Sequence, residues 1–281
     1  MVRYIIEMKY LVTFHTWATQ NDTEVIEVYE KIKSETVTME DSSGSTYSRF
    51  CLEEGTEAYN YAVKSLSSRA PSKLTLYENA VFTKKELENV RYYQLLPKWP
   101  LELEGKDTED FGTQHVNGCP GCGLGKKLEG NIYIDRKFLH DKHFCWLPPE
   151  YGVSERMKKF FESINASGIS FGDKILDWKN RPIDEFYELK VNNILPPMSP
   201  NTWFEKIPRI RFEKLLCEHP EIYERSNYKY KKEDLDNALD FNLTNESLNT
   251  SNSREMIVSS RIKDELAKIK YRARFTPVIE E

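Results

Sequence analysis

The sequence lacks an excess of positive charge and any apolar run long enough to cross a bilayer. Its 40 Lys and Arg residues stand against 45 Asp and Glu residues, which gives a formal net charge of -5 at pH 7. A dedicated nucleic-acid-binding protein usually carries a basic excess, so this balance argues against nucleic acid as the partner. A signal peptide is not expected either, because Glu7, Lys9 and His15 interrupt the apolar residues of the first stretch. We therefore expect a cytoplasmic protein without a membrane segment.

The sequence also lacks the short motifs of several enzyme classes. It has no His-Glu-x-x-His, no Gly-x-Ser-x-Gly and no His-x-Glu ahead of a Cys-x-x-Cys. A phosphate-binding loop is excluded at Gly125-Lys126, because no glycine stands five residues before Gly125 and Lys127 replaces the required Ser or Thr. Without a recognisable catalytic arrangement, we expect no enzyme activity.

Cysteine is scarce, and its five residues are spaced unevenly. An odd number spread over a long chain favours a reducing compartment and free or metal-bound thiols over a disulfide framework. Cys119 and Cys122 form the Cys-x-x-Cys of the stretch VNGCPGCGLGKK. A turn of this length lets two thiolates point at one metal ion, and its glycines let backbone N–H groups turn toward the sulfurs. A redox role is less favoured, because no thioredoxin-like βαβ pattern precedes the motif.

A structural zinc site needs four ligands, and the sequence has no second Cys-x-x-Cys. His143 and Cys145 would point to the same face of an expected strand, so they are the first choice for the second pair. His115, four residues before Cys119, is a further candidate ligand. The residues therefore predict a structural zinc site, although a knuckle-shaped turn that binds no metal stays open. The predicted ligands are Cys119, Cys122, His143 and Cys145.

The pattern of apolar residues predicts an α+β fold with mixed or antiparallel sheets and short flanking helices. Loose alternation over residues 2–14 predicts strands, whereas helical spacing over 53–66 predicts a helix. An acidic, turn-prone segment, 101–110, predicts the boundary between an N-terminal α+β domain, 1–105, and a C-terminal α+β domain, 106–281.

Two stretches of the C-terminal part resemble each other, 153–171 and 258–275. In each, a serine (Ser154 or Ser259) is placed to cap a helix whose apolar residues share one face, and a strand follows. We therefore predict a pseudo-repeated strand–helix–strand unit whose helices pack on related sheet faces through these apolar stripes.

Three stretches resemble a known family. They are CPGCG after Phe111-Gly112-Thr113, ELKVNNILPP at 188–197, and VSSRIKDELAKIKYRARFTPV at 258–278. In them the chain resembles the paralogous double-CxxCG proteins of myxobacteria and related bacterial toxin-immunity proteins, over roughly residues 83–281. The resemblance implies a protein that binds a cognate toxin domain and neutralises it without catalysis.

The resemblance also implies a second CxxCG element near Cys217, where this sequence has only Cys217 and His219. These two residues are therefore a rival to His143 and Cys145 as the second pair of zinc ligands. Two alternative functions follow from the zinc motif, a nucleic-acid-binding knuckle and a zinc-dependent hydrolase. Acid–base residues for a hydrolase stand nearby at His140, Asp141, Glu150 and Glu155.

Overall fold

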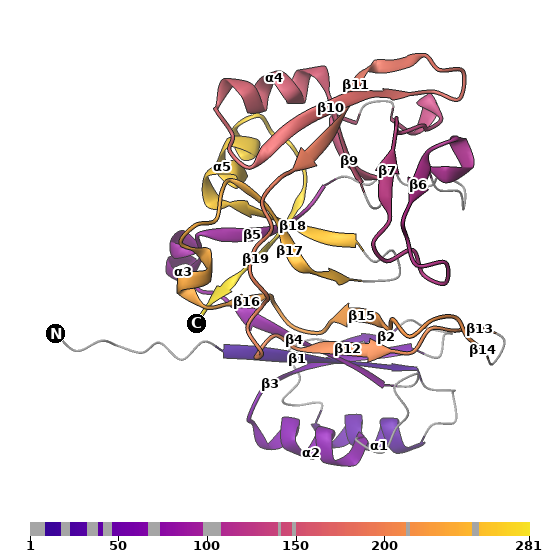
Figure 1. The fold of residues 1–281 in the computed structure, drawn as a ribbon. Helices are drawn as coiled ribbons and strands as arrows, with labels where there is room; N and C mark the ends of the chain where they lie inside the picture. The colour runs from indigo at the N-terminus through magenta and orange to yellow at the C-terminus, as the bar shows by residue number, and fades with distance from the viewer. Residues whose placement is uncertain are drawn as a thin grey trace. The chain divides into compact units, whose positions relative to one another are not determined.

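Figure 1 shows the fold as a ribbon, taken from a computed structural model. The structure describes residues 9–17, 23–32, 39–41, 47–66, 74–97, 108–139, 142–147, 150–211, 214–248 and 253–281. Contacts divide the chain into two compact units. The first comprises 1–89 and 225–227, and the second comprises 90–224 and 228–281.

The first unit is an antiparallel sheet with two helices, α1 and α2, packed on one face (Figure 1). Its strands lie in the order β2-β3-β1-β4. Val12 and Phe14, alternate residues of β1, pack against Ala58 and Leu66 of α2. This confirms the helix predicted within 53–66, while residues 2–8 of the predicted first strand lie outside the described residues. The elements are β1 (Lys9–Trp17), α1 (Thr23–Ile32), β2 (Met39–Asp41), β3 (Tyr47–Glu53), α2 (Glu57–Leu66), β4 (Leu74–Val81) and α3 (Lys84–Asn89).

The second unit contains two four-stranded sheets, α4 and α5, and several short hairpins. Its first half begins with β5 (Tyr92–Leu96). It continues with η1 (Glu109–Phe111), β6 (Gln114–Val116), β7 (Lys127–Glu129), η2 (Arg136–Phe138), β8 (Phe144–Leu147), β9 (Glu150–Ser154), α4 (Glu155–Ser163), β10 (Ile169–Leu176) and β11 (Pro182–Val191). Its second half comprises β12 (Phe204–Ile207), β13 (Ile210–Arg211), β14 (Lys214–Leu215), β15 (Glu221–Glu224), β16 (Lys229–Tyr230), η3 (Lys232–Leu235), β17 (Phe241–Leu248), β18 (Ser253–Ser259), α5 (Ser260–Lys268), β19 (Arg274–Pro277) and β20 (Ile279–Glu280).

The division between the units falls earlier than the predicted boundary at residue 105. The reason is that β5 pairs with β18 on one edge and with β19 on the other, and so belongs with the C-terminal residues. Most of the acidic segment used for the prediction, 101–107, lies outside the described residues.

Both predicted strand–helix–strand units are present, and each forms part of an antiparallel four-stranded sheet. In each sheet the strand before the helix and the strand after it flank one central strand, and a hairpin adds a fourth strand. The two matching orders are β10-β11-β9-β8 and β19-β5-β18-β17. The central strand β11 follows its helix in the chain, whereas β5 precedes its helix. The repeat therefore extends beyond the two matching stretches to the whole sheet.

The two helices also begin and end alike. Ser154 and Ser259 have extended backbones, and each hydroxyl accepts a hydrogen bond from the backbone N–H of the third residue after it. After each helix the chain turns through a residue with positive φ, 49° at Asn165 and 56° at Lys270. The predicted caps are thus confirmed, and the ends of the repeat match as well.

We expect Ser154→Ala to lower the free energy of unfolding by about 1 kcal/mol, because it removes the acceptor from the first turn of α4. Ser259→Ala is expected to cost more, since the second partner of the Ser259 hydroxyl is the Asp240 carboxylate, at 2.8 Å, whereas that of the Ser154 hydroxyl is the His143 ring, at 3.1 Å. Urea unfolding measures both, with Ser163→Ala, at the exposed end of α4, as the control. Equal losses for Ser154→Ala and Ser163→Ala would contradict the capping role.

One apolar cluster joins the two sheets and their helices. Phe161 of α4 is 1% exposed and meets the rings of Phe144 and Phe241 edge to face, at centroid distances of 5.7 and 5.1 Å. Leu266 of α5 is fully buried in the same cluster. The predicted apolar stripes are therefore core, except for Ile269 at the end of α5, which is 39% exposed. The fold is α+β with mostly antiparallel strands. Among the described residues, no helix combines the length and the apolar character that a membrane crossing would need.

Candidate metal centre

The Cys-x-x-Cys turn lies in the loop of the β6–β7 hairpin. The two strands pair from Gln114 with Glu129 to Val116 with Lys127, which places the loop at their ends. Inside the loop, the backbone N–H of Gly123 donates to the Cys119 carbonyl over 2.7 Å. Gly123 has a φ of 75°, a conformation that favours glycine. Local hydrogen bonds therefore fix the turn that the sequence predicted.

A second loop meets this turn at Gly121. A Cβ added to Gly121 would lie 2.4 Å from the Leu216 carbonyl oxygen and 2.9 Å from the Cys217 Cβ. Only glycine allows the two backbones to approach so closely. The second loop follows the β13–β14 hairpin. A hydrogen bond of 2.8 Å from the Leu216 N–H to the Arg209 carbonyl continues the pairing beyond the two strands. This contact brings Cys217 and the residues after it beside the turn.

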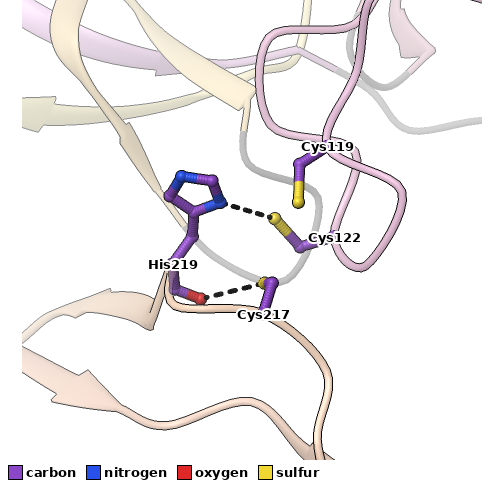
Figure 2. Close-up of side chains that lie close together, drawn as sticks. All are labelled: Cys119, Cys122, Cys217 and His219. Carbon is purple, nitrogen blue, oxygen red and sulfur yellow. Dashed lines mark hydrogen bonds between the residues drawn. The ribbon is translucent and has the colours of Figure 1, made fainter.

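The side chains of Cys119, Cys122, Cys217 and His219 converge at this point, as Figure 2 shows. Their sulfur and nitrogen donor atoms all lie within 4.8 Å of one another. Cys122 Sγ is 3.6 Å from His219 Nδ1, and the Cys217 thiol donates to the His219 carbonyl over 3.6 Å. This cysteine–histidine cluster can hold a metal ion, since it offers one ligand atom from each of four residues.

The surroundings favour a thiolate at Cys119. Backbone N–H groups of Gly121 and Cys122 donate to its sulfur and, with the His219 side chain, lower the pKa of Cys119 to about 6. Burial raises the pKa of Cys217, and the neighbouring Cys122 sulfur raises it further. A thiol with a lowered pKa is deprotonated near neutral pH, which is the form that binds metal ions.

The structure brings together the rival pair, Cys217 and His219, and places His143 and Cys145 elsewhere. Cys145 lies in β8, fully buried in an apolar cluster, where its thiol donates to the Gly152 carbonyl over 3.7 Å. Burial raises the pKa of Cys145 far above its usual value. His143 Nδ1 is 3.1 Å from the Ser154 hydroxyl oxygen. Neither residue contributes a donor atom to the cluster, because β8 and the residue before it belong to the sheet around β11 and not to the two loops.

His115 is not a donor of the cluster either. Its side chain is 2% exposed and lies between two carboxylates, with Nδ1 2.9 Å from Glu109 and Nε2 2.9 Å from Glu150. Glu109 also accepts a hydrogen bond from Lys126. The Glu150 carboxylate raises the pKa of His115, against the effect of burial, and Glu109 adds to the rise. The protonated His115 ring, in β6, therefore links the β6–β7 hairpin to β9 through its ion pair with the Glu150 carboxylate.

This arrangement gives a prediction for pH. The pKa of His115 is higher in the folded protein, so the stabilisation is complete below the ordinary histidine pKa of about 6.5 and is lost as pH rises through the higher value. We expect His115→Gln to cost about 1–3 kcal/mol at pH 6 and much less at pH 9. Urea unfolding of both proteins across this range measures the difference. An equal cost at both pH values would refute the charged state of His115.

Of the acid–base residues near the motif, the two that the structure describes, Glu150 and Glu155, do not lie at the cluster. Glu150 is bound to His115, and Glu155 forms an ion pair of 3.0 Å with Lys159 in α4. His140 and Asp141 lie outside the described residues. Sequence reasoning missed Arg209, which is 7% exposed, pairs with Glu221 over 3.2 Å and lines the same hollow as the cysteine turn. No sequence signal marks Arg209, because the fold of the second loop is what brings it beside the cysteine turn.

Comparison of the chain with protein-family models and with curated proteins gives no match.

Proposed function

We propose that this chain is an immunity-type protein of the bacterial cytoplasm that binds a cognate toxin domain and neutralises it without catalysis, and that its cysteine–histidine cluster holds a structural zinc ion. The observation that carries the zinc proposal is the convergence of three cysteines and one histidine from two separate loops. The immunity role is supported by the three stretches that resemble the double-CxxCG and toxin-immunity proteins.

The donor set and its distances suit zinc. Sulfur at about 2.3 Å and nitrogen at about 2.1 Å from a tetrahedral zinc ion lie about 3.6 Å apart. Cys122 Sγ and His219 Nδ1 are 3.6 Å apart. Three cysteines and one histidine fill all four positions, whereas catalytic zinc usually keeps one position for water. This composition supports a structural ion and gives a hydrolase no specific support.

A zinc ion here would join two loops that are far apart in the chain, since Cys122 and His219 are 97 residues apart. It would fix the β13–β14 hairpin beside the β6–β7 hairpin. The β13–β14 hairpin exposes large apolar side chains, with Ile210 61% and Leu215 60% exposed. Clustered exposed apolar residues are typical of protein-binding surfaces. We place part of the toxin contact on this hairpin, which the zinc ion holds in position.

The test asks whether a toxin domain is encoded beside the gene of this protein, and then co-expresses the two. We expect the wild-type chain to protect the cells and to bind the toxin domain in a pull-down. Leu215→Glu is expected to weaken binding at least tenfold while the protein keeps its metal, because a charge at a desolvated contact is costly. Trp178→Glu, at a residue 62% exposed on the β10–β11 turn, is the matched control. A wild-type chain that neither binds nor protects would refute the immunity role.

A further inference from the structure

A cavity of about 330 Å³ lies where the start of α4 meets the end of α5. Three cationic side chains line it, Arg156, Lys270 and Arg272, and His143 lies beside them. Among the described residues no carboxylate pairs with these three cations, and no Asp or Glu lines the cavity. Unpaired positive charges that converge on a hollow are suited to an anion.

The remaining wall is apolar. Met157 and Phe160 come from α4, and Ile269 and Tyr271 come from the end of α5. The Tyr271 hydroxyl donates to the Phe144 carbonyl over 2.6 Å, which fixes the ring. A ligand of this cavity would therefore combine an anionic group with an apolar body.

The other strand–helix–strand unit gives a counterpart for these cations. Phe144 pairs with Val153 as Phe241 pairs with Val258, so the residues before them, His143 and Asp240, occupy equivalent positions. The backbone N–H of Ser154 donates to the His143 carbonyl over 2.9 Å, and that of Ser259 to the Asp240 carbonyl over 3.0 Å. By the same match, Arg156 in α4 corresponds to Arg261 in α5.

In the α5 unit, the chain itself supplies the carboxylate. Asp240 accepts hydrogen bonds from the Arg261 guanidinium, from the Ser259 hydroxyl over 2.8 Å, and from the Ser167 backbone N–H and hydroxyl, each over 2.9 Å. Arg261 also donates to the Ile164 carbonyl at the end of α4, over 2.9 Å. The carboxylate thus connects the start of one helix to the end of the other.

In the α4 unit the matching carboxylate is replaced and positive charge is added. His143 stands in place of Asp240, Lys270 in place of Asn165, and Arg272 in place of Ser167. Arg156 therefore faces the end of α5 without the internal partner that Arg261 has.

We propose that this cavity binds a small organic carboxylate with an apolar body, whose carboxylate lies against Arg156 as the Asp240 carboxylate lies against Arg261. Arg272 and Lys270 add charge to this subsite. Met157, Phe160 and Ile269 contact the apolar body. The site is separate from the cysteine–histidine cluster, and none of its residues is a donor there.

Isothermal titration with phenylacetate tests the proposal, with 2-phenylethanol as the neutral control of similar shape and acetate as the control without an apolar body. We expect phenylacetate to bind at least tenfold more tightly than either control. Arg156→Gln is expected to weaken phenylacetate binding at least tenfold, since each charge-assisted hydrogen bond contributes strongly. Arg274→Gln, at an exposed arginine outside the cavity, is expected to leave it unchanged.

The sharpest variant is His143→Asp, which gives the α4 unit the carboxylate of its counterpart. We expect this protein to stay folded and to lose phenylacetate binding, because the new carboxylate occupies Arg156. Circular dichroism and thermal unfolding check the fold. The proposal is overturned if phenylacetate binds no better than 2-phenylethanol, if Arg274→Gln weakens binding as much as Arg156→Gln, or if folded His143→Asp binds phenylacetate like the wild type.

Discussion

Metal analysis of the purified protein is expected to find about one zinc ion per chain, and Cys119→Ser is expected to lose it. Cys119 is one of four donors within 4.8 Å, and a serine hydroxyl is a poor zinc ligand. Because the ion would bind the folded loops and not the unfolded chain, its loss also removes stability. At free zinc a thousandfold above the dissociation constant, the stabilisation is about 4 kcal/mol.

The controls separate the two sets of ligands. His143→Gln and Cys145→Ala are expected to keep the zinc ion, because neither residue contributes to the cluster. His219→Cys is expected to keep it as well, since four cysteines form an equally good tetrahedral site. Loss of zinc in Cys145→Ala but not in Cys217→Ser would show that His143 and Cys145 are the second pair of ligands. It would refute the cysteine–histidine cluster as the metal centre.

Phe161→Ala is expected to lower the free energy of unfolding by about 3–5 kcal/mol. The ring is 1% exposed and lies between Phe144 of one sheet and Phe241 of the other, so its removal leaves a cavity that the two sheets cannot close. Denaturant unfolding measures the change.

Phe160→Ala is the matched control in the same helix. Phe160 is only partly buried at the margin of the cluster, so a smaller loss is expected. Zinc content is expected to stay the same in both variants, because the cysteine–histidine cluster lies in loops outside α4. A loss below about 1 kcal/mol for Phe161→Ala would show that the two sheets do not share a core.

The features that the sequence predicted correctly are those set by neighbouring residues. Ser154 and Ser259 each precede a helix with apolar residues at a period of 3.6, and both signals act within one or two turns. The cysteine turn is likewise local, since glycines and short-range hydrogen bonds shape it. The strand–helix–strand repeat and the α+β class could therefore be predicted without knowledge of the packing.

The second pair of ligands could not be chosen in this way. The pattern predicts a strand at Cys145, and β8 confirms it, but the face on which the side chain lies is decided by the apolar cluster under β8. Cys217 reaches the turn only because Gly121 lets the Leu216 carbonyl approach, across a long separation in the chain. The boundary between the units depended in the same way on β5, whose partners lie at the other end of the sequence.

The place of β5 has a consequence for how the protein is synthesised. Tyr93 and Leu95 of β5 leave the ribosome long before β18 and β19, the strands that hydrogen-bond to the two edges of β5, are made. Until then an apolar strand has no partner on either side, which exposes the nascent chain to association with other chains. Closing this sheet needs contacts of high sequence separation, so it is expected to be the slow step of folding. The sheet around β11 has all of its strands in one continuous segment and can form before β18 and β19 are made.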